Sequence, residues 1–427
     1  MTTSLIDESV LDAAVNAMPG DCLVDHRRKA AKRFAALGFP TVGQEDWKYT
    51  NLSKLAEFSL EWLRDAPADP AGDSETDIDD IVGAVKSGIN AHWIVVRDGL
   101  PGVSLPDIPG VDVERLSTAD NASLSADDAL SAFNVALLRE GLRIRVNAGT
   151  APDKPIAILN IDSPGSRVSQ ARIIIELAEN AGLQIVECAL STGEGPQFTN
   201  SVVDISLGQG ARLDHVRIQD RHSDHSGVHR IQAALDRDAT VRFNGFDFGG
   251  ALTRNDVVTD INGTGASVIL NGLYLAAGEQ HIDNHTSINH GTGPSTSNEE
   301  YRGILTGRSQ CVFNGKVIVA KGADGTDSSQ SNHNLLLSDR AEIDTKPELE
   351  IYADDVKCAH GATVGQLDQA ALFYLCSRGL DRDQAKQILT RAFAAGTLSA
   401  LSVPACHEFI AARLDRRLAE LVDDVDD

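Results

Sequence analysis

Apolar and polar residues alternate over a long central part of the chain, from about residue 141 to residue 365. Ile173, Ile175 and Leu177 show the pattern, in which every second side chain is apolar. Because successive side chains of a strand point to opposite faces, this period of two is typical of β-strands that bury one face. Glycine-containing turns separate the runs. We therefore expect strand to follow strand throughout this region.

A short cassette recurs within this central region. Each copy has a turn, then a small residue, then the start of a strand, as in GTGASVIL and TGRSQCVF. The small residues lie at offsets of roughly 30 residues, except for one offset of 43: Ala181, Ala211, Ala239, Ala266, Ser309 and Ala341. Such repetition indicates stacked units. A parallel β-helix returns the chain to one edge after each coil, so it explains the recurring turn better than a β-sandwich does.

Helical spacing of apolar residues predicts helices on both sides of this region. The predicted helices before it cover residues 7–16, 25–37 and 129–140, and residues 92–96 resemble a short buried strand. The predicted helices after it cover residues 368–379, 381–396 and 405–422. We divide the chain into an N-terminal helical region with an acidic loop (1–140), a parallel β-helix core (141–365) and a C-terminal helical region (366–427).

Two segments of the N-terminal region have an unusual composition. EDWKYTNL, residues 45–52, holds Trp47, Tyr49 and Leu52 in a chain with only 5% aromatic residues, so we expect it to be anchored on another element. Residues 65–80 are acidic and rich in proline, alanine and glycine. We interpret them as a solvated linker or loop.

Composition and charge exclude several classes of protein. A net charge of −24 disfavours binding to nucleic acid, because the phosphate backbone would be repelled. No stretch approaches the roughly 20 apolar residues that span a membrane, and the N-terminus lacks a basic, apolar signal, so we expect a cytoplasmic protein. The six cysteines form no CxxC pair, which predicts reduced thiols rather than disulfides or a preformed zinc site.

The stretch Lys346–Gly365 carries the first candidate site. Its apolar parity shifts across Asp354-Asp355, so that Cys358 and His360 share one face of the following strand. A thiol and an imidazole in that relation could bind a soft or borderline metal, or could simply pack beside each other.

Polar candidates also occur further upstream. Four residues of GEQHIDNHTSINH share parity and form a possible metal ladder: Glu279, His281, Asp283 and His285. Same-face neighbours lie about 7 Å apart along a strand, which is too far for four to close on one ion, so a polar outer face or stacking between coils is the favoured alternative. His222, His225 and His229 lie in a loop-like stretch and are expected to be mostly solvated.

The C-terminal helices carry apolar residues that must pack on something. Four of them are candidates for docking a partner: Leu372, Phe373, Ile388 and Phe393. The alternative is that these helices only cap the last open coil, as the terminal repeats of solenoids must.

Several motifs together resemble the SufB/SufD family of iron–sulfur cluster assembly proteins, and the SufD side of it most. They are EDWKYTNL, GEQHIDNHTSINH, EEYRGILTGRSQCVFNGKVIV, KPELEIYADDVKCAHGATVGQLD and ALFYLCSRGL. The resemblance implies a right-handed parallel β-helix between helical regions. It also implies a SufB-like scaffold paired through the end of the β-helix, and a SufC-like ATPase bound to the C-terminal helices.

The family's C-x-H-G-A-T motif matches Cys358 and His360, which the resemblance places at the contact with SufB, where iron or a nascent cluster is held. Where SufB-type chains tend to carry a cysteine, this chain reads Asn332-His333-Asn334. The resemblance therefore implies an accessory role in iron supply and cluster assembly. No cofactor is expected on this chain alone, whereas the complex is expected to hold iron or a cluster transiently and to be able to bind reduced flavin.

We therefore expect a non-catalytic subunit of the SUF machine. One alternative is a purely structural β-helix scaffold without metal contact. Another is a β-helix enzyme acting on carbohydrate, but aromatic residues are few and no paired-acid cluster occurs on one coil. ATP hydrolysis is disfavoured because no G-x-x-x-x-G-K-[ST] loop is present.

Overall fold

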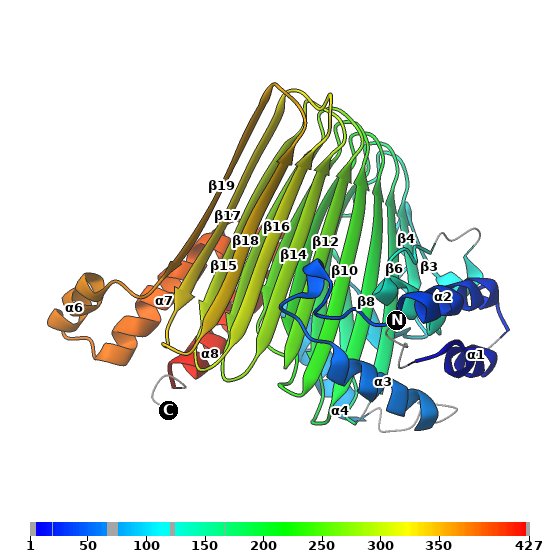
Figure 1. Cartoon of the computed structure of the whole chain (residues 1–427), viewed down its shortest axis with the longest axis horizontal. Helices are drawn as coiled ribbons and strands as arrows, with labels where there is room; N and C mark the ends of the chain where they lie inside the picture. Colours follow the sequence, from blue (N-terminus) through cyan, green and yellow to red (C-terminus); the bar gives the residue numbers. More distant parts are fainter. Residues whose placement is uncertain (1–5, 19, 66–75, 120–123, 166, 424–427) are drawn as a thin grey trace.

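Two long sheets that face each other make up most of the molecule (Figure 1). The computed structural model describes residues 6–18, 20–65, 76–119, 124–165 and 167–423. The helices in these residues are α1 (Glu8–Asn16), α2 (Val24–Leu37), α3 (Ser53–Asp65), α4 (Thr76–Gly88), α5 (Ala129–Ala136), α6 (Gln369–Ser377), α7 (Arg382–Ser399) and α8 (His407–Asp423). The 3₁₀ helices are η1 (Glu45–Trp47), η2 (Leu116–Thr118) and η3 (Pro404–Cys406).

The first sheet has the order β19-β17-β15-β13-β11-β9-β7-β5-β1-β2, and we call it sheet A. Its strands are β1 (His92–Arg97), β2 (Leu100–Pro101), β5 (Ile156–Asp162), β7 (Gly182–Ser191), β9 (Arg212–Asp220), β11 (Thr240–Asp247), β13 (Ser267–Ala276), β15 (Thr296–Leu305), β17 (Thr326–Leu336) and β19 (Val356–Gly365).

The second sheet, sheet B, has the order β18-β16-β14-β12-β10-β8-β6-β4-β3. Its strands are β3 (Val111–Arg115), β4 (Leu142–Val146), β6 (Arg167–Leu177), β8 (Gln197–Leu207), β10 (His225–Leu235), β12 (Leu252–Ile261), β14 (His281–His290), β16 (Gln310–Val319) and β18 (Glu342–Ile351). From β4 onward the chain alternates between the sheets, so each coil adds one strand to each of them.

All later strand pairs are parallel and in register, and only β1–β2 and β3–β4 pair antiparallel at the start. This arrangement is a parallel β-helix of about eight turns. The prediction of a β-helix rather than a sandwich is confirmed. The repeat of roughly 30 residues is the length of one coil, as in the pairing of Ser267 with Thr296.

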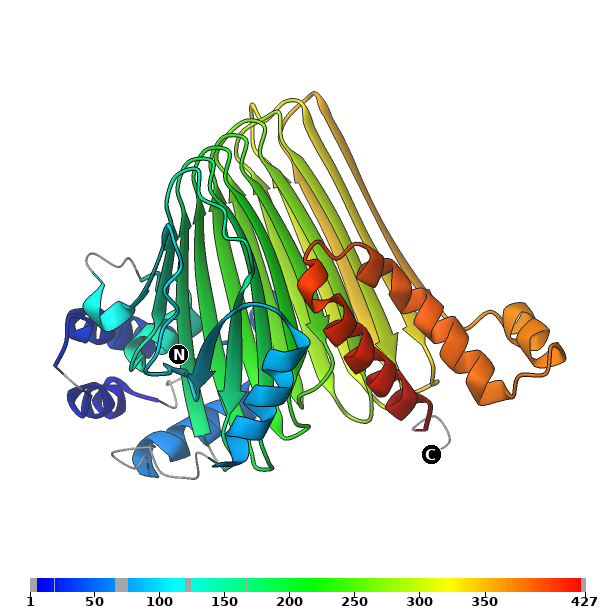
Figure 2. The same ribbon diagram turned by 180° about the vertical axis from the view of Figure 1, so that it is seen from behind.

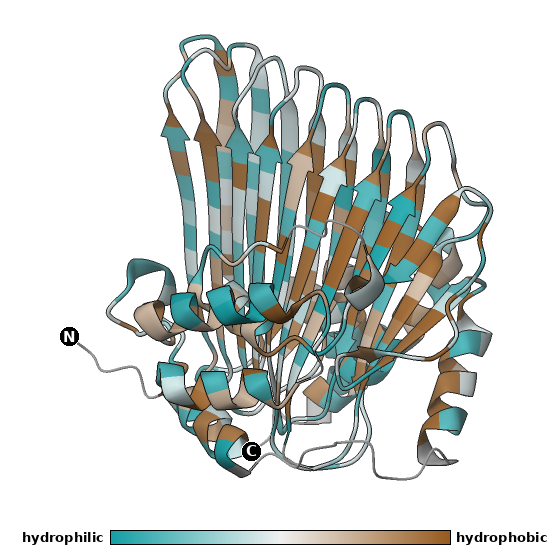
Figure 3. Ribbon diagram, turned by 90° about the vertical axis from the view of Figure 1, so that its right-hand side faces the viewer, coloured by the Kyte–Doolittle hydropathy of each residue, from teal (hydrophilic) through white to brown (hydrophobic). Residues whose placement is uncertain are grey.

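Apolar side chains from both sheets fill the space between them, which we call the lumen. Along the strands, hydrophobic and hydrophilic residues alternate, as Figure 3 shows. Register stacks equivalent residues of successive coils; one stack in sheet B is Leu177, Leu207, Leu235 and Ile261, each at most 3% exposed. Burying one such side chain contributes about 1.5–3 kcal/mol relative to leaving it exposed, so these stacks hold the coils together.

The cassette of small residues belongs to both edges of the β-helix rather than to one. Ala266 precedes β13, and its stacked neighbour in the next coil is Ser295, because Ser267 pairs with Thr296. Ser309 and Ala341 instead precede β16 and β18 in sheet B. The expectation of a single recurring turn is therefore wrong for the last two copies, and the offset of 43 marks a change of edge.

Helices cover the outer faces of both sheets. Helices α4, α7 and α8 lie on the outer face of sheet A (Figure 2). Helices α1, α2, α3 and α5 pack together beside the first coils of sheet B. Asp220 at the end of β9 fixes the last helix, because Arg413, Arg416 and Arg417 of α8 all donate to its carboxylate, at 3.1, 2.7 and 2.6 Å.

Most of the predicted helices are confirmed, but two of them end at other residues. Helix α5 ends at Ala136 instead of residue 140. Helix α7 runs past Gly396 to Ser399 instead of ending at this glycine. A Cβ at Gly396 would lie 2.8 Å from the Arg302 guanidinium, so the small residue serves a close contact rather than a helix end. The strand predicted near residue 92 is β1, which is in register with β5 as the first rung of sheet A.

The acidic segment lies partly outside the described residues, since residues 66–75 are not among them. From Thr76 onward the chain forms α4. None of the helices in the described residues is both long and apolar enough to cross a membrane.

The lumen near the last coils depends on glycines that leave room for large neighbours. A Cβ at Gly303 of β15 would lie 2.3 Å from the Tyr274 ring and 2.5 Å from the Asn334 side-chain oxygen. A Cβ at Gly361 of β19 would meet no other atom within 4 Å. Glycine at position 303 is therefore a packing requirement, whereas glycine at position 361 is not.

We predict that Gly303→Ala destabilises the protein by about 1–3 kcal/mol, because the added methyl overpacks the lumen. Thermal unfolding followed by circular dichroism measures the effect as a lower melting temperature. Gly361→Ala is the matched control and is expected to leave the melting temperature unchanged. Equal shifts for the two variants would contradict this account of the lumen.

Candidate functional site

The last coil, formed by β18 and β19, is the open end of the β-helix. Each strand is the terminal strand of its sheet, so one edge of each has no strand neighbour among the described residues. Whereas inner strands are largely buried, most of β19 is exposed and β18 is only partly covered. Backbone groups along these edges are available for pairing with another chain.

Register places Cys358 and His360 on the inner side of this terminal coil. Cys358 pairs with Ser328 and His360 pairs with Gln330, both of which are buried residues facing the lumen. Cys358 is half-buried against the apolar core, and burial, followed by the nearby Asp327, raises the pKa of its thiol. His360 is exposed. The shared face expected from the sequence is therefore present.

Cys358 and His360 do not make a metal site by themselves. Residues two apart on a strand have side chains about 7 Å apart. In the part of the chain that the structure describes, no group of three His, Cys, Asp or Glu side chains is arranged to hold a metal ion. Any metal held here needs further ligands from a second chain.

Polar side chains continue from the terminal coil into the lumen. The Gln330 amide donates from Nε2 to Glu299 Oε2 at 2.7 Å, and both residues are buried. Burial raises the pKa of Glu299 to about 7. Sequence reasoning missed both residues, although their parity with His360 follows from the 30-residue repeat.

A second polar network in the lumen includes Asn332 and Asn334. They lie where the resemblance to SufB-type chains would place a cysteine. Asn334 Nδ2 donates to Asn332 Oδ1 at 2.6 Å, and Tyr274 and Thr345 donate to the same two amides at 2.6 and 2.8 Å. His333 has the opposite parity and lies outside, with its Nδ1 2.9 Å from Thr363 Oγ1. The two asparagines therefore bind the last coils together.

The proposed metal ladder on β14 has another role in the structure. Glu279 lies in the turn before β14. Thr50 Oγ1 lies 2.8 Å from His281 Nε2 and donates to Asp283, and His285 Nε2 lies 3.0 Å from Asp283 Oδ1. These side chains hold the N-terminal segment on the outer face of sheet B and do not converge on a common point for an ion.

Arg254 of β12 completes this attachment, which we call the N-terminal strap (residues 45–52). Its guanidinium bonds to Asp283 at 2.6 Å and to the Asp46 carbonyl at 2.8 Å, and it lies 4.0 Å from the Trp47 ring centroid. The expected anchoring of EDWKYTNL is therefore confirmed. Burial would raise the pKa of Asp283, but Arg254, His285 and Thr50 outweigh it and hold that pKa well below its usual range.

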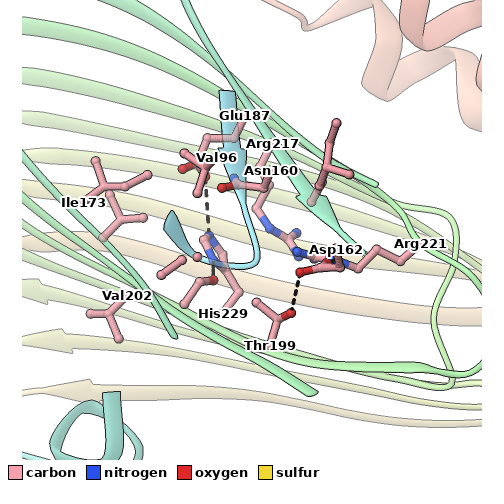
Figure 4. A pocket seen from close by; sticks show the side chains of 16 residues that line it. Val96, Asn160, Asp162, Ile173, Glu187, Thr199, Val202, Arg217, Arg221 and His229 are labelled. Carbon is pink, nitrogen blue, oxygen red and sulfur yellow. Dashed lines mark hydrogen bonds and ion pairs between the residues drawn. The ribbon is translucent and has the colours of Figure 1, made fainter. Parts of the chain in front are cut away.

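The structure also corrects the expectation for the histidines after residue 220. His222 is exposed, but His225 and His229 are buried in the lumen face of β10. His229 Nδ1 lies 2.5 Å from Ser201 Oγ, and its Nε2 lies 3.8 Å from the Glu187 carboxylate (Figure 4). The sequence around His225 and His229 resembles a loop, because the inward positions at the start of strand β10 are polar.

These buried groups line a cavity of about 20 Å³ between β5, β7, β8 and β9 (Figure 4). Asp162 is held there by Arg221 at 2.5 Å, and Arg217 is paired with Asp247 at 2.8 Å. Such a volume has room for about one water molecule. The cluster is thus a neutralised polar part of the core with no space for a substrate.

The four apolar residues predicted to dock an ATPase fall into two pairs in the structure, one covered and one exposed. Leu372 is 2% exposed and belongs to the interior of the helical pair. Phe393 packs against the cluster beneath α7, with the Arg302 guanidinium 5.4 Å from its ring. Phe373 is 75% exposed and Ile388 46%. Tyr374, which the sequence reasoning did not select, is also exposed, so α6 and α7 together carry three exposed large side chains of this kind.

Comparison with known proteins gives family matches in two parts of the chain. A model of the SufBD core domain of the SUF system for FeS cluster assembly matches residues 159–393, and a model of the N-terminal region of SufBD proteins matches residues 10–67. Among the relatives, iron–sulfur cluster assembly protein SufD of Escherichia coli (strain K12) is 32% identical over 391 residues, covering 89% of this chain and 90% of that protein.

More distant relatives match over similar spans. An iron–sulfur cluster assembly SufBD family protein of Synechocystis sp. is 29% identical over 401 residues, covering 90% of this chain and 88% of that protein. Iron–sulfur cluster assembly protein SufD of Bacillus subtilis (strain 168) is 23% identical over 308 residues, covering 72% of this chain and 70% of that protein.

We predict that Arg254→Met weakens the N-terminal strap, because it leaves the fully buried Asp283 carboxylate without its cation. Breaking a buried pair in this way typically costs about 3–5 kcal/mol. Thermal unfolding and limited proteolysis within residues 41–52 measure the loss. The control is Lys346→Met, which removes a 2.9 Å bond to Glu45 of the same strap at a largely solvated site. A surface pair contributes at most about 1 kcal/mol, so similar losses for both variants would contradict the prediction.

Proposed function

The chain belongs to the SufBD family of the SUF iron–sulfur cluster assembly system, and we propose that it works there as a SufD-like, non-catalytic subunit. It pairs with a SufB-like scaffold and binds a SufC-like ATPase. The observation that carries this proposal is the open terminal coil, which presents unpaired strand edges together with Cys358 and His360. The family resemblance of the sequence motifs is confirmed by the matches.

Pairing through the terminal coil is supported by the exposure of β18 and β19. A partner strand beside each would continue both sheets and satisfy the free backbone groups of the two edges. Exposed apolar residues at this end, Ile351 and Val364, would be covered by the same contact. A β-helix of the same family offers a matching coil, so the partner of this surface is a SufB-like chain.

His360 and Cys358 contribute to holding iron or a nascent cluster, which is the cargo of the system. An exposed imidazole is an available ligand, and Cys358 lies two residues away on the same face of β19. Because burial raises the pKa of the Cys358 thiol, less of this thiol is present at neutral pH as the thiolate that binds metal. The remaining ligands come from the partner, and a site divided between two chains opens when the chains move.

A non-catalytic role is supported by the polar groups inside the β-helix. The charged residues between β5 and β9 are paired with one another, and their cavity has room for about one water molecule only. Chemistry is therefore assigned to the partner subunits. This chain provides a surface, part of a cargo site and a connection to the ATPase.

ATPase binding is assigned to the exposed face of α6 and α7. Phe373, Tyr374 and Ile388 lie there, and Figure 1 shows α6 projecting away from the β-helix. Such exposed aromatic and aliphatic groups are typical of interface anchors, in which a few residues supply most of the binding energy. Leu372 and Phe393 support this surface from inside.

We predict that Phe373→Asp and Ile388→Asp abolish ATPase binding and leave the melting temperature unchanged, because both side chains are exposed. Affinity purification from native extract, without a nickel column, and identification of the bound proteins measure the effect. Val103→Asp is the control, since Val103 is 99% exposed on the N-terminal region. Recovery of wild-type chain alone, without any ATPase, would count against the assignment.

We predict that His360→Ala gives an intact three-component complex that fails to build clusters. Iron and labile sulfide in the purified complex, together with the rate of cluster assembly in cells, measure the effect. Cys358→Ala is expected to have a smaller effect, because a half-buried thiol is replaced at a modest packing cost. Assembly at the normal rate by His360→Ala would remove His360 from the proposed site.

A further inference from the structure

One stack of inward residues leads through the lumen to His360. In sheet A, Leu270 pairs with Glu299, Glu299 with Gln330, and Gln330 with His360. Strands in a sheet lie about 4.8 Å apart, so each side chain of the stack lies directly beside the next. The stack changes from aliphatic to polar in its last three positions. Two buried polar residues therefore stand behind the exposed histidine.

Hydrogen bonding fixes the direction of the Gln330 amide. Only its nitrogen can donate to the Glu299 carboxyl group, and Nε2 lies 2.7 Å from Glu299 Oε2. Across the lumen, a Cβ at Gly315 would lie 2.1 Å from the same nitrogen, so the amide fits closely in the space that this glycine leaves. With Nε2 held by Glu299, the amide oxygen is the atom left for another partner.

That oxygen is buried and has no hydrogen-bond partner among the described atoms. A buried acceptor without a partner costs about 1–3 kcal/mol, and native proteins keep few of them. Gln330 is 3% exposed, and its neighbour on the open side of the stack is His360. An imidazole N–H is a suitable donor for this acceptor.

We propose that Glu299 and Gln330 are positioning residues that orient the His360 imidazole. Gln330 Oε1 accepts the N–H of one ring nitrogen, and Glu299 holds the Gln330 amide in the required direction. The other ring nitrogen, which carries no proton, then faces the partner chain. This inference rests on the proposed function, because the cargo role of His360 is what gives its orientation importance.

The chemical reason is that a metal binds the unprotonated nitrogen of a neutral imidazole. The hydrogen bond made by the opposite nitrogen determines which tautomer is present and how the ring is turned. Here a glutamine lies between the carboxyl group and the imidazole. The Glu299 carboxyl retains an acceptor oxygen in both protonation states, so the positioning does not require its charge.

The experiment compares substitutions that remove these bonds with one that keeps them. Gln330→Met and Glu299→Met preserve size but cannot hydrogen-bond, whereas Glu299→Gln retains an acceptor oxygen for Gln330. Ser328→Ala is the control, because Ser328 faces the lumen beside Cys358, and its hydroxyl accepts a hydrogen bond from Ser297 Oγ at 2.8 Å in a stack that neighbours that of Gln330. Melting temperatures of all variants show that each chain is folded.

The measurement is the tautomer of His360 in the full chain labelled with [¹⁵N]histidine, recorded by NMR at a pH where the ring is neutral. His360→Asn identifies the signal by its loss. We expect one dominant tautomer in the wild type, in Glu299→Gln and in Ser328→Ala, and a mixture in both methionine variants. Cluster assembly by the complex should fall about tenfold in the methionine variants, as is typical when the group behind a ligand is lost.

A wild-type tautomer in Gln330→Met overturns the inference, and so does a mixture in Glu299→Gln, which would mean that charge is needed. Should a methionine variant not fold, Gln330→Leu and the Glu299→Gln result decide the question. Failure of the proposed function is recognised separately. In that case His360→Ala builds clusters normally, whatever the tautomer of the wild-type ring.

Discussion

In-register parallel pairing is the constraint on which the rest of this structure depends. Because each strand lies directly beside its equivalent one coil away, every side chain contacts the residue in the same position of the next coil. Leu177 and Leu207 stack as hydrocarbon, and Ser297 and Ser328 stack as a hydrogen-bonded pair. Inward polar residues can therefore find hydrogen-bond partners in the neighbouring coils, as Ser297 and Ser328 do.

The same constraint makes the ends of the β-helix different from its middle. At its beginning, β2 and β3 fold back antiparallel and helices pack on the first coils, so that end is covered. At the other end, the described residues offer no further strand; α6 leads the chain away from the coil, and α7 returns to the outer face of sheet A. A coil without its next neighbour leaves stacking contacts unused, which is why we propose that a partner chain binds there.

Alternation alone predicted much of the β-helix, including the change of parity that brings Cys358 and His360 onto one face. It did not show which sheet each strand belongs to. Similar turns precede strands of both sheets: Ala266 precedes β13 of sheet A, and Ser309 precedes β16 of sheet B. It also misplaced His229, since a polar residue in the lumen looks the same in sequence as one in water. On α6, Leu372 and Phe373 are adjacent and equally apolar, so only tertiary packing shows that one is covered and the other free.

The N-terminal strap imposes an order on folding. Thr50 and His281 are 231 residues apart in the chain, so the strap cannot form its hydrogen bonds to β14 until that strand has been synthesised. At about 5–20 residues per second, this delay lasts on the order of 10–50 s on the ribosome. During that time Thr50 remains without its contacts to His281 and Asp283, and the coils must form beside it. The strap thus completes its attachment only after the β-helix has grown past its middle, although it precedes the β-helix in the chain.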